Sequence, residues 1–368
     1  MLSDQMAALE PPEGVFSNFT NPPTRQPTLI IASAFTLFLS LGGIGARTYA
    51  RAAIMRQFDL TDYVLLLCGA LFIAFTSVQI LAGEYGQGKH LWDVTATSFS
   101  HALLILNIIE ILYGPTMFCA KYVVLRQIES VFFNHHRKAF AFTAVRALIW
   151  ANLLFYGAIS LSFILACIPR AKITNPEISG ICIDTRASII ATSAINVVSD
   201  FTILITPLAA IGQLQLPTKK KLSVAAVFGV GILATVTSAV RLYYSVALTR
   251  TDDITWAIIP VASWALGEFT TVILVACFPY FPRLFQSFRP KNRNPGYLAF
   301  QDTGRSASNN EGKPGQRPEY WHDSSTALAT SALATSRDRE YAMRNEGIKL
   351  EDQLPKLNAS GKAQSGFT

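Results

Sequence analysis

Charged side chains are scarce in this 368-residue chain. Only 15% of the residues are Asp, Glu, Lys or Arg, whereas 51% are apolar. Soluble domains carry about 25% charged residues. The apolar residues gather in blocks of about twenty between Thr28 and Pro282, which is the length that crosses a bilayer. The scarcity of charge therefore argues against a large water-soluble core and favours a membrane protein.

Two other patterns are missing. Met1–Asn21 has no basic start followed by an apolar core, as a cleaved signal peptide would have, so we expect the first apolar block to act as the insertion signal. The blocks also lack the alternation of a membrane β-strand, which leaves helices as the element that fits. The sequence thus predicts an all-α fold, a seven-transmembrane helix bundle. The predicted helices cover residues 29–48, 61–83, 101–123, 143–168, 187–212, 222–246 and 256–281.

Lysine and arginine divide the connections into a rich set and a poor set. The rich set contains Arg51, Arg56, Arg126, Arg137, Lys138, Lys219, Lys220, Lys221, Arg283, Arg289, Lys291 and Arg293. The poor set contains Arg25, Lys89, Arg170, Lys172, Arg186 and Arg250. Because cytoplasmic connections carry the excess of cations, we expect an outside N-terminus and a cytoplasmic C-terminus, in the plasma membrane. The net charge of +7 then fits membrane lipids as partners and needs no nucleic acid.

Three regions follow from this reading. Residues 1–28 are expected to form a short extracellular segment, residues 29–283 the seven-helix membrane domain, and residues 284–368 a cytoplasmic tail. The tail begins with FPRLFQSFRP, whose phenylalanines have helical spacing, so we expect a short amphipathic helix on the inner leaflet rather than a frayed extension of the seventh span. From Lys291 onward the composition is polar, with the repeat ALATSALATS, and predicts disorder.

The predicted outer side carries two candidate modifications. Asn18-Phe19-Thr20 is a glycosylation sequon, although such tripeptides also occur by chance. Cys167 and Cys182 lie at or beyond the outer end of the fourth span, in an oxidising compartment. We expect a disulfide between them; two free thiols, one of them buried, are the alternative.

The connection Gly83–Val94 reads GEYGQGKHLWDV. Its glycines follow no strand and precede no Lys-Ser/Thr pair, which argues against a phosphate-binding loop. His90 and Asp93 could gather a metal with His101, but polar residues beside headgroups are more often solvated, so we predict no metal. We interpret Trp92 as an interfacial anchor and Asp93 as the N-cap of the third helix. These three loop residues, His90, Trp92 and Asp93, are the outer-loop candidates.

A few ionisable residues interrupt the spans: Glu110, Lys121, Arg146, Asp200, Arg241 and Glu268. Each costs at least about 2.5 kcal/mol on insertion and should find a partner. Lys121, Asp200 and Glu268 lie at compatible depths and could form a network. Glu110 shares a face with Lys121 but lies about 16 Å away along the helix. Arg241 is expected to reach the headgroups, with Asp93, Asp252 or Asp253 as alternative partners. Such a network could bind a ligand, relay protons or act as a lock, or could simply fix helix register.

Several motifs occur in a fixed order along residues 29–283. They are RTYAR at 47–51, LTDYVLL at 60–66, GQGKHLWDV at 86–94, the cysteine pair, NVVSDFTILITP at 196–207, Arg241, DDITW at 252–256 and GEFTTVILVACFPYFP at 267–282. Together they resemble the fungal rhodopsin-domain integral membrane proteins, which include a satratoxin-cluster type and plant-infection receptor-like members. Tyr63, where a second acidic residue would follow Asp62, and the lack of a tryptophan between the two cysteines depart from that pattern and weaken the transfer of loop-specific roles.

The resemblance implies a seven-helix membrane protein that is sometimes a GPCR-like sensor. A microbial retinal pigment needs a lysine in the seventh span for its Schiff base, and Trp256–Phe281 has none. We therefore expect no retinal and no other cofactor. The third span ends in YVVLRQIES rather than Asp-Arg-Tyr, so G-protein coupling rests on the resemblance alone.

No nucleophile-and-base set or cofactor fingerprint is present, so we expect no enzyme. The leading hypothesis is a receptor-like sensor of an unknown extracellular or membrane ligand, with a cytoplasmic signalling partner. The alternatives are a transporter or channel that uses the intramembrane charges, and a scaffold for other membrane proteins.

Overall fold

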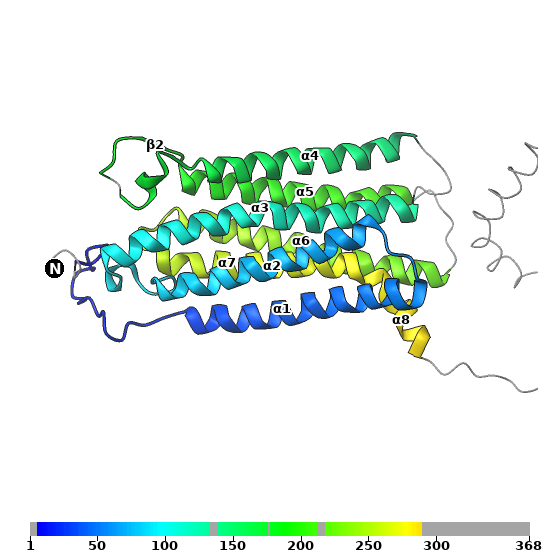
Figure 1. The fold of residues 1–368 in the computed structure, drawn as a ribbon, viewed down its shortest axis with the longest axis horizontal. Coiled ribbons are helices and arrows are strands. Elements are labelled where there is room, and N and C mark those ends of the chain that lie inside the picture. The colour runs from blue at the N-terminus through cyan, green and yellow to red at the C-terminus, as the bar shows by residue number, and fades with distance from the viewer. Residues whose placement is uncertain (1–5, 133–138, 176, 212–217, 289–368) are drawn as a thin grey trace, which may run out of the picture. The chain divides into compact units, whose positions relative to one another are not determined.

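The computed structural model describes residues 6–132, 139–175, 177–211 and 218–288, all within one compact unit, Met1–Asn292. Seven long helices lie side by side in this unit (Figure 1). Each is long and apolar enough to cross a membrane, which confirms the predicted seven-helix bundle. The helices are α1 (Gln26–Tyr49), α2 (Leu60–Glu84), α3 (Ala96–Phe132), α4 (Ala139–Ile164), α5 (Thr185–Ile211), α6 (Thr218–Leu248) and α7 (Ile254–Cys277). The tail predicted to be disordered lies outside the described residues.

The two ends of the bundle differ in their elements (Figure 1). One end holds the N-terminal segment, the turn Leu91–Asp93, and a small antiparallel pair of strands, β1 (Cys167–Ile168) and β2 (Ile181–Cys182), with the turn Arg170–Ile173 between them. We call it the disulfide end. The other end holds a π-helical turn, Ala50–Met55, that continues α1, and the short helix α8 (Phe281–Phe288), which follows the turn Phe278–Tyr280. We call it the α8 end.

The strand pair explains why α4 stops earlier than the sequence predicted. The fourth span was expected to reach residue 168, but α4 ends at Ile164 because Cys167 pairs in register with Cys182. The two cysteines form the expected disulfide, across a sequence separation of 15. The amide of Ile183 also donates to the carbonyl of Ala166. The bridge and the strand pair together fix the connection between α4 and α5.

α3 is longer than predicted at both ends and spans 37 residues, with Pro115 inside it. Its first turn is capped by Thr95, whose hydroxyl accepts a hydrogen bond from the amide of Ser98 at 3.3 Å. Asp93 therefore does not act as the expected N-cap. Its carboxylate accepts instead from the amide of Asn18, at 2.8 Å, and so holds the N-terminal segment against the disulfide end.

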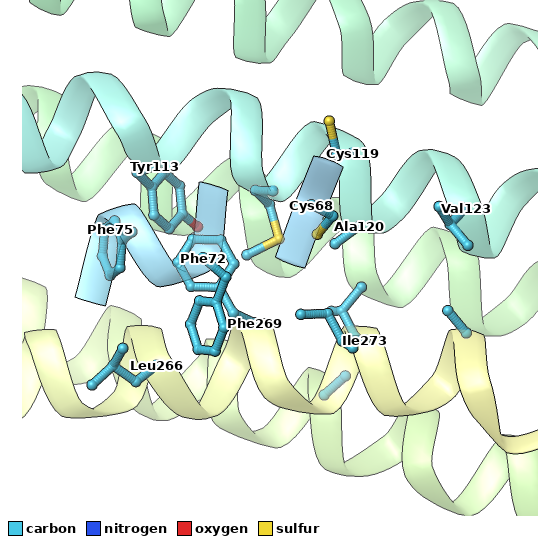
Figure 2. Packing of buried hydrophobic residues seen from close by; sticks show 14 of the residues in the cluster. Cys68, Phe72, Phe75, Tyr113, Cys119, Ala120, Val123, Leu266, Phe269 and Ile273 are labelled. Atoms are coloured by element: carbon cyan, nitrogen blue, oxygen red, sulfur yellow. The ribbon is translucent and has the colours of Figure 1, made fainter. Parts of the chain in front are cut away.

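α7 forms the centre of the bundle and is the most enclosed of the seven helices. Aromatic rings from α2 and α3 meet Phe269 of α7 in the core, and Figure 2 shows Phe72, Phe75 and Tyr113 around it. The ring centroids lie 5.0 to 5.5 Å from that of Phe269, the spacing at which tilted aromatic pairs attract. By contrast, α4 exposes large apolar side chains such as Trp150, as a face toward lipid would.

Candidate functional site

An ion pair joins α3 to α5 in the interior of the bundle. The ammonium nitrogen of Lys121 lies 2.7 Å from Oδ1 of Asp200, and both side chains are buried. Lys121 also donates to the side-chain oxygen of Asn196 at 2.7 Å, and the hydroxyl of Tyr156, on α4, donates to the same oxygen. A lysine in this position cannot reach water, so its charge depends on these oxygens.

A second ion pair joins α6 to α7. Nε of Arg241 lies 2.7 Å from Oε2 of Glu268, although the two atoms are not aligned as a hydrogen bond. Nη2 of Arg241 donates to the hydroxyl of Tyr113, on α3, at 2.7 Å. Glu110, also on α3, is close enough to Arg241 for electrostatic attraction. The structure brings four of the nominated charges together in this way and leaves Glu110 at their edge.

This placement corrects the expectation that Arg241 reaches the headgroups. Arg241 is only 4% exposed, because α6 turns it toward α7 and α3. The proposed outer partners are engaged elsewhere: Asp252 lies 3.7 Å from Arg186, and Asp253 contacts His90. Arg146 departs from expectation in the opposite sense. Its side chain is 60% exposed, 3.6 Å from Glu129, so it does not face the interior.

Ser238 of α6 links the two ion pairs. Its hydroxyl oxygen contacts Oδ2 of Asp200, lies 3.1 Å from Oε1 of Glu268, and lies 3.3 Å from Nδ2 of Asn196. The linked set takes side chains from α3, α4, α5, α6 and α7, all of them buried. We call it the central network; it comprises Tyr113, Lys121, Tyr156, Asn196, Asp200, Ser238, Arg241 and Glu268.

The uncharged members of the central network were not nominated from the sequence. Asn196 precedes Asp200 by four residues, and Ser238 precedes Arg241 by three. Residues at these spacings share one face of a helix. The signal was therefore present, since a polar residue one turn from an intramembrane charge is placed to satisfy it. Helical spacing alone does not tell which helices meet.

A second set of charges lies near the α8 end. Asp62 of α2 receives both arginines of the RTYAR motif: Arg47 donates from Nη2 at 3.1 Å and Arg51 from Nε at 2.8 Å. Arg47 also donates to the side-chain oxygen of Gln127 at 2.9 Å and to the carbonyl of Ala276 at 2.7 Å. Arg51 pairs in addition with Asp59. We call Arg47, Arg51, Asp59, Asp62, Gln127 and the Ala276 carbonyl the arginine clamp.

The arginine clamp was also missed as a site. Sequence counting treated Arg51 as a cation of a connecting loop, but it is 7% exposed within the π-helical turn that extends α1. Two signals pointed to the pairing. Arginines four residues apart share a helix face, and Asp59 with Asp62 has the spacing of a capping box, which α2 forms. The clamp joins α1, α2, α3 and the end of α7.

A third constellation lies at the disulfide end. The ring of His90 stacks between Trp92 and Trp256, with ring centroids 4.3 Å and 3.9 Å away. Nδ1 of His90 lies 2.6 Å from Oδ2 of Asp253, and the guanidinium of Arg25 sits 4.2 Å above the ring of Trp256. We call these five residues the histidine stack. Trp92 is therefore part of a stack, and its role as an interfacial anchor stays a prediction.

Glycine makes the loop of the histidine stack possible. Gly86 and Gly88 have φ values of +106° and +93°, a region that side chains disfavour. The amide of Gly88 donates to the carbonyl of Thr255 at 2.8 Å, and its carbonyl accepts from the amide of Arg25 at 2.8 Å. The loop is thus tied to α1 and α7 through its own backbone.

The remaining candidates lie at the surface of the disulfide end. Asn18 is exposed, and its side-chain oxygen accepts from the amides of Thr20 and Asn21, so the sequon forms a turn. His101 is exposed and faces Tyr85, with ring centroids 5.8 Å apart. Among the described residues, no three His, Cys, Asp or Glu side chains gather as a metal site would require.

Comparison with known proteins points to one group. A family model for the fungal rhodopsin domain matches residues 46–287. The chain is 34% identical over 220 residues to a SAT4 family membrane protein of Emericella nidulans, covering 60% of this chain and 56% of that protein. It is 25% identical over 297 residues to fugralins biosynthesis cluster protein 2 of Gibberella zeae, covering 76% of this chain and 70% of that protein. The chain thus spans little more than half the length of the first relative. No solved structure matches it.

Proposed function

The chain belongs to the fungal rhodopsin domain family and is a multi-pass membrane protein; from that premise we propose that it is a receptor-like sensor of an extracellular or membrane-borne ligand. The ligand would act from the disulfide end, and the response would be read at the α8 end by a cytoplasmic partner. The protein would reside in the plasma membrane.

The proposed orientation has two supports. The disulfide between Cys167 and Cys182 is expected to persist only on an oxidising side of the membrane. The opposite side carries residues 219–221, three lysines at the start of α6, and the cations after α7, which favours a cytoplasmic location for it. The two arguments are independent, because one concerns redox chemistry and the other charge.

The observation that carries the proposal is the central network. Four charged side chains at most 6% exposed are paired across helices rather than within one helix. Replacing a buried ion pair by apolar residues is often neutral or stabilising, so stability alone is a weak reason for such a network. A set of pairs that joins separate helices does have one property that apolar packing lacks: it has discrete made and broken states. A ligand that favours one state would shift the packing of the helices.

The network is placed to connect the two ends of the bundle. α7 carries Trp256 of the histidine stack, then Glu268 of the central network, and then the Ala276 carbonyl that Arg47 binds. α3 carries Lys121 and, six residues later, Gln127 of the arginine clamp. A change in the ion pairs would therefore be transmitted to the α8 end along two continuous helices.

The test uses the full-length chain expressed at matched surface abundance with the Asp200→Asn and Glu268→Gln variants. Cyclic nucleotide, calcium and membrane current are recorded in the same cells, without added ligand. We expect both variants to change the basal messenger level without a steady current, because Asp200→Asn weakens the pairing with Lys121 and Glu268→Gln fixes that side chain in an uncharged state. Arg146→Gln is the matched control: it removes a charge from α4 outside the central network and should behave as the wild type.

Two results would contradict the proposal. A current or tracer flux that depends on Asp200 and Glu268, with messengers unchanged, would assign the charges to a transport pathway. Equal basal levels of every messenger in the wild type and both variants, at equal abundance, would leave the charges a purely structural role. Epitope tags at the two termini, probed before and after permeabilisation, test the orientation separately.

A further inference from the structure

The charges in and beside the central network do not balance. Lys121 and Arg241 supply two positive charges, whereas Asp200, Glu268 and Glu110 supply three carboxylates. Four of these five groups are paired in the interior and balance when all are ionised. Glu110 is half-buried and is close enough to Arg241 for electrostatic attraction. One carboxylate of the network can therefore be neutral while Arg241 keeps a counter-charge, so that no buried cation is left uncompensated.

The hydrogen bonds at Ser238 require one further donor. Its hydroxyl has one proton to give, but three acceptors surround it: Oδ2 of Asp200, Oε1 of Glu268 at 3.1 Å and the carbonyl of Ala234 at 3.0 Å. Nδ2 of Asn196, at 3.3 Å, uses one of its two lone pairs. A hydroxyl can donate once and accept twice. If Asp200 and Glu268 were both ionised, at least one of these carboxylates would face a lone pair of the Ser238 oxygen, with no hydrogen between them.

From these two counts we infer that the central network binds one proton, held on Oε1 of Glu268. Glu268 then donates to the oxygen of Ser238, and Ser238 donates to Oδ2 of Asp200. The hydroxyl makes one donation and two acceptances, which satisfies it fully. The charges become two positive and two negative. The proton thus gives Glu268 a donor toward Ser238, and Glu110 remains as a counter-charge for Arg241.

Asp200 is the less suitable place for this proton. Its Oδ1 accepts from Lys121 at 2.7 Å, and Nδ2 of Asn196 points toward its Oδ2 at 3.4 Å. Both oxygens are thus surrounded by donors, as in an ionised carboxylate. Glu268 differs, because Arg241 approaches its Oε2 without hydrogen-bond alignment and directs Nη2 to Tyr113 instead. The groups that face Glu268 are Arg241 and Ser238 from α6, Asp200 from α5, Lys121 and Tyr113 from α3, and Tyr156 from α4.

The proton gives the site a chemical ligand. Its release to water leaves Glu268 as a carboxylate beside Arg241 and facing Asp200, so the interior gains a negative charge and the contact through Ser238 loses a donor. Taken with the proposed function, on which this step alone rests, the two states of the sensor would differ by one proton. The ligand response would then depend on the pH of the side to which the network opens.

Infrared spectroscopy of the purified full-length chain in lipid nanodiscs tests the proton directly. A neutral carboxylic acid has a carbonyl band separate from that of a carboxylate, and the band shifts in D2O. We expect such a band at neutral pH, its loss in Glu268→Gln, and its retention in the control Glu129→Gln, which changes a buried carboxylate outside the central network. In Ser238→Ala the band should shift, because its hydrogen-bond partner is gone; this variant serves if Glu268→Gln does not fold.

Three outcomes would overturn the inference. The first is a band that persists unchanged in Glu268→Gln or does not shift in Ser238→Ala. The second is a band removed by Glu129→Gln, which would place the proton outside the central network. The third is a band present in N-methylglucamine buffer and absent in sodium buffer, which would mean that a metal cation takes the place of the proton. None of these readouts requires signalling, so the inference can fail while the proposed function stands, and the reverse.

Discussion

The central network and the arginine clamp are both sets of buried charges, but their partners differ in kind. In the clamp two arginines meet two aspartates, so the charges balance, and Arg47 also grips a backbone carbonyl at 2.7 Å. One member, Asp59, is 67% exposed. In the central network most links are between side chains of different helices, although Lys121 also lies 3.4 Å from the backbone carbonyl of Asn196, and carboxylates outnumber cations once Glu110 is included. We therefore expect the clamp to hold the helices in one arrangement and the network, if it binds the proposed proton, to have a second state.

The largest effect is expected from breaking the arginine clamp at Asp62. Asp62→Asn leaves Arg47, which is 1% exposed, without its counter-ion. Removing one partner of a buried ion pair costs about 3–5 kcal/mol, and we expect the upper end of that range because Asp62 serves two arginines. The midpoint of thermal unfolding of the detergent-solubilised chain measures it.

The control is Asp59→Asn, which removes an exposed carboxylate that pairs with Arg51, the second arginine of the clamp. We expect a loss of no more than about 1 kcal/mol, as for surface pairs. Equal losses in the two variants would contradict the view that the clamp is held by Asp62.

A loss of about 3 kcal/mol is expected from Lys121→Met, because Asp200 is left charged and unpaired in the interior. The double variant Lys121→Met with Asp200→Leu removes both charges and should recover most of that stability. Abundance of folded protein by size-exclusion chromatography gives the comparison. If the double variant is as unstable as the single one, the central network stabilises the fold as the arginine clamp does. The proposed difference between the network and the clamp would then be wrong.

The disulfide end supplies a third comparison, because its constraint is covalent. Changing both Cys167 and Cys182 to serine opens a loop with a sequence separation of 15, which should cost about 3 kcal/mol in the chain-entropy account. Reducing agent should lower the unfolding midpoint of the wild type by a similar amount and leave the double variant unchanged. An effect of reductant on the double variant would point to the buried cysteines instead.

The smallest effect is expected at the histidine stack. His90→Phe keeps an aromatic ring between Trp92 and Trp256 but loses the contact with Asp253, so we expect a loss of about 1 kcal/mol. His90→Ala removes the stacking as well and should lose about 1 kcal/mol more. Unfolding midpoints of the two variants and the wild type, measured together, separate the two contributions. Identical midpoints for His90→Phe and His90→Ala would mean that stacking contributes nothing.

The seven helices could be predicted from the sequence because each apolar block is long enough to span a bilayer. The disulfide followed from where its two cysteines fall relative to those blocks. The partners of the charges could not be predicted equally well. Depth along a helix is readable from residue number, and it brought Lys121, Asp200 and Glu268 together. The rotation of a helix about its axis and the identity of its neighbours cannot be read from residue number. Arg241 was therefore predicted to reach the headgroups, although α6 turns it toward the interior. The arginine clamp was missed for two reasons. Arg51 lies in the π-helical turn beyond the apolar block that defined the end of α1, and Arg47 and Asp62, although inside predicted spans, were not counted among the intramembrane charges.

Pro115 makes α3 easier to bend at one point along its length. Proline has no amide hydrogen, so the backbone bond to the carbonyl four residues earlier is missing at that point. Tyr113, which receives Arg241, lies on one side of this joint, and Lys121, which pairs with Asp200, lies on the other. The two ion pairs thus contact α3 on opposite sides of Pro115. A small bend at the joint changes the tilt of one pair relative to the other while both keep their partners.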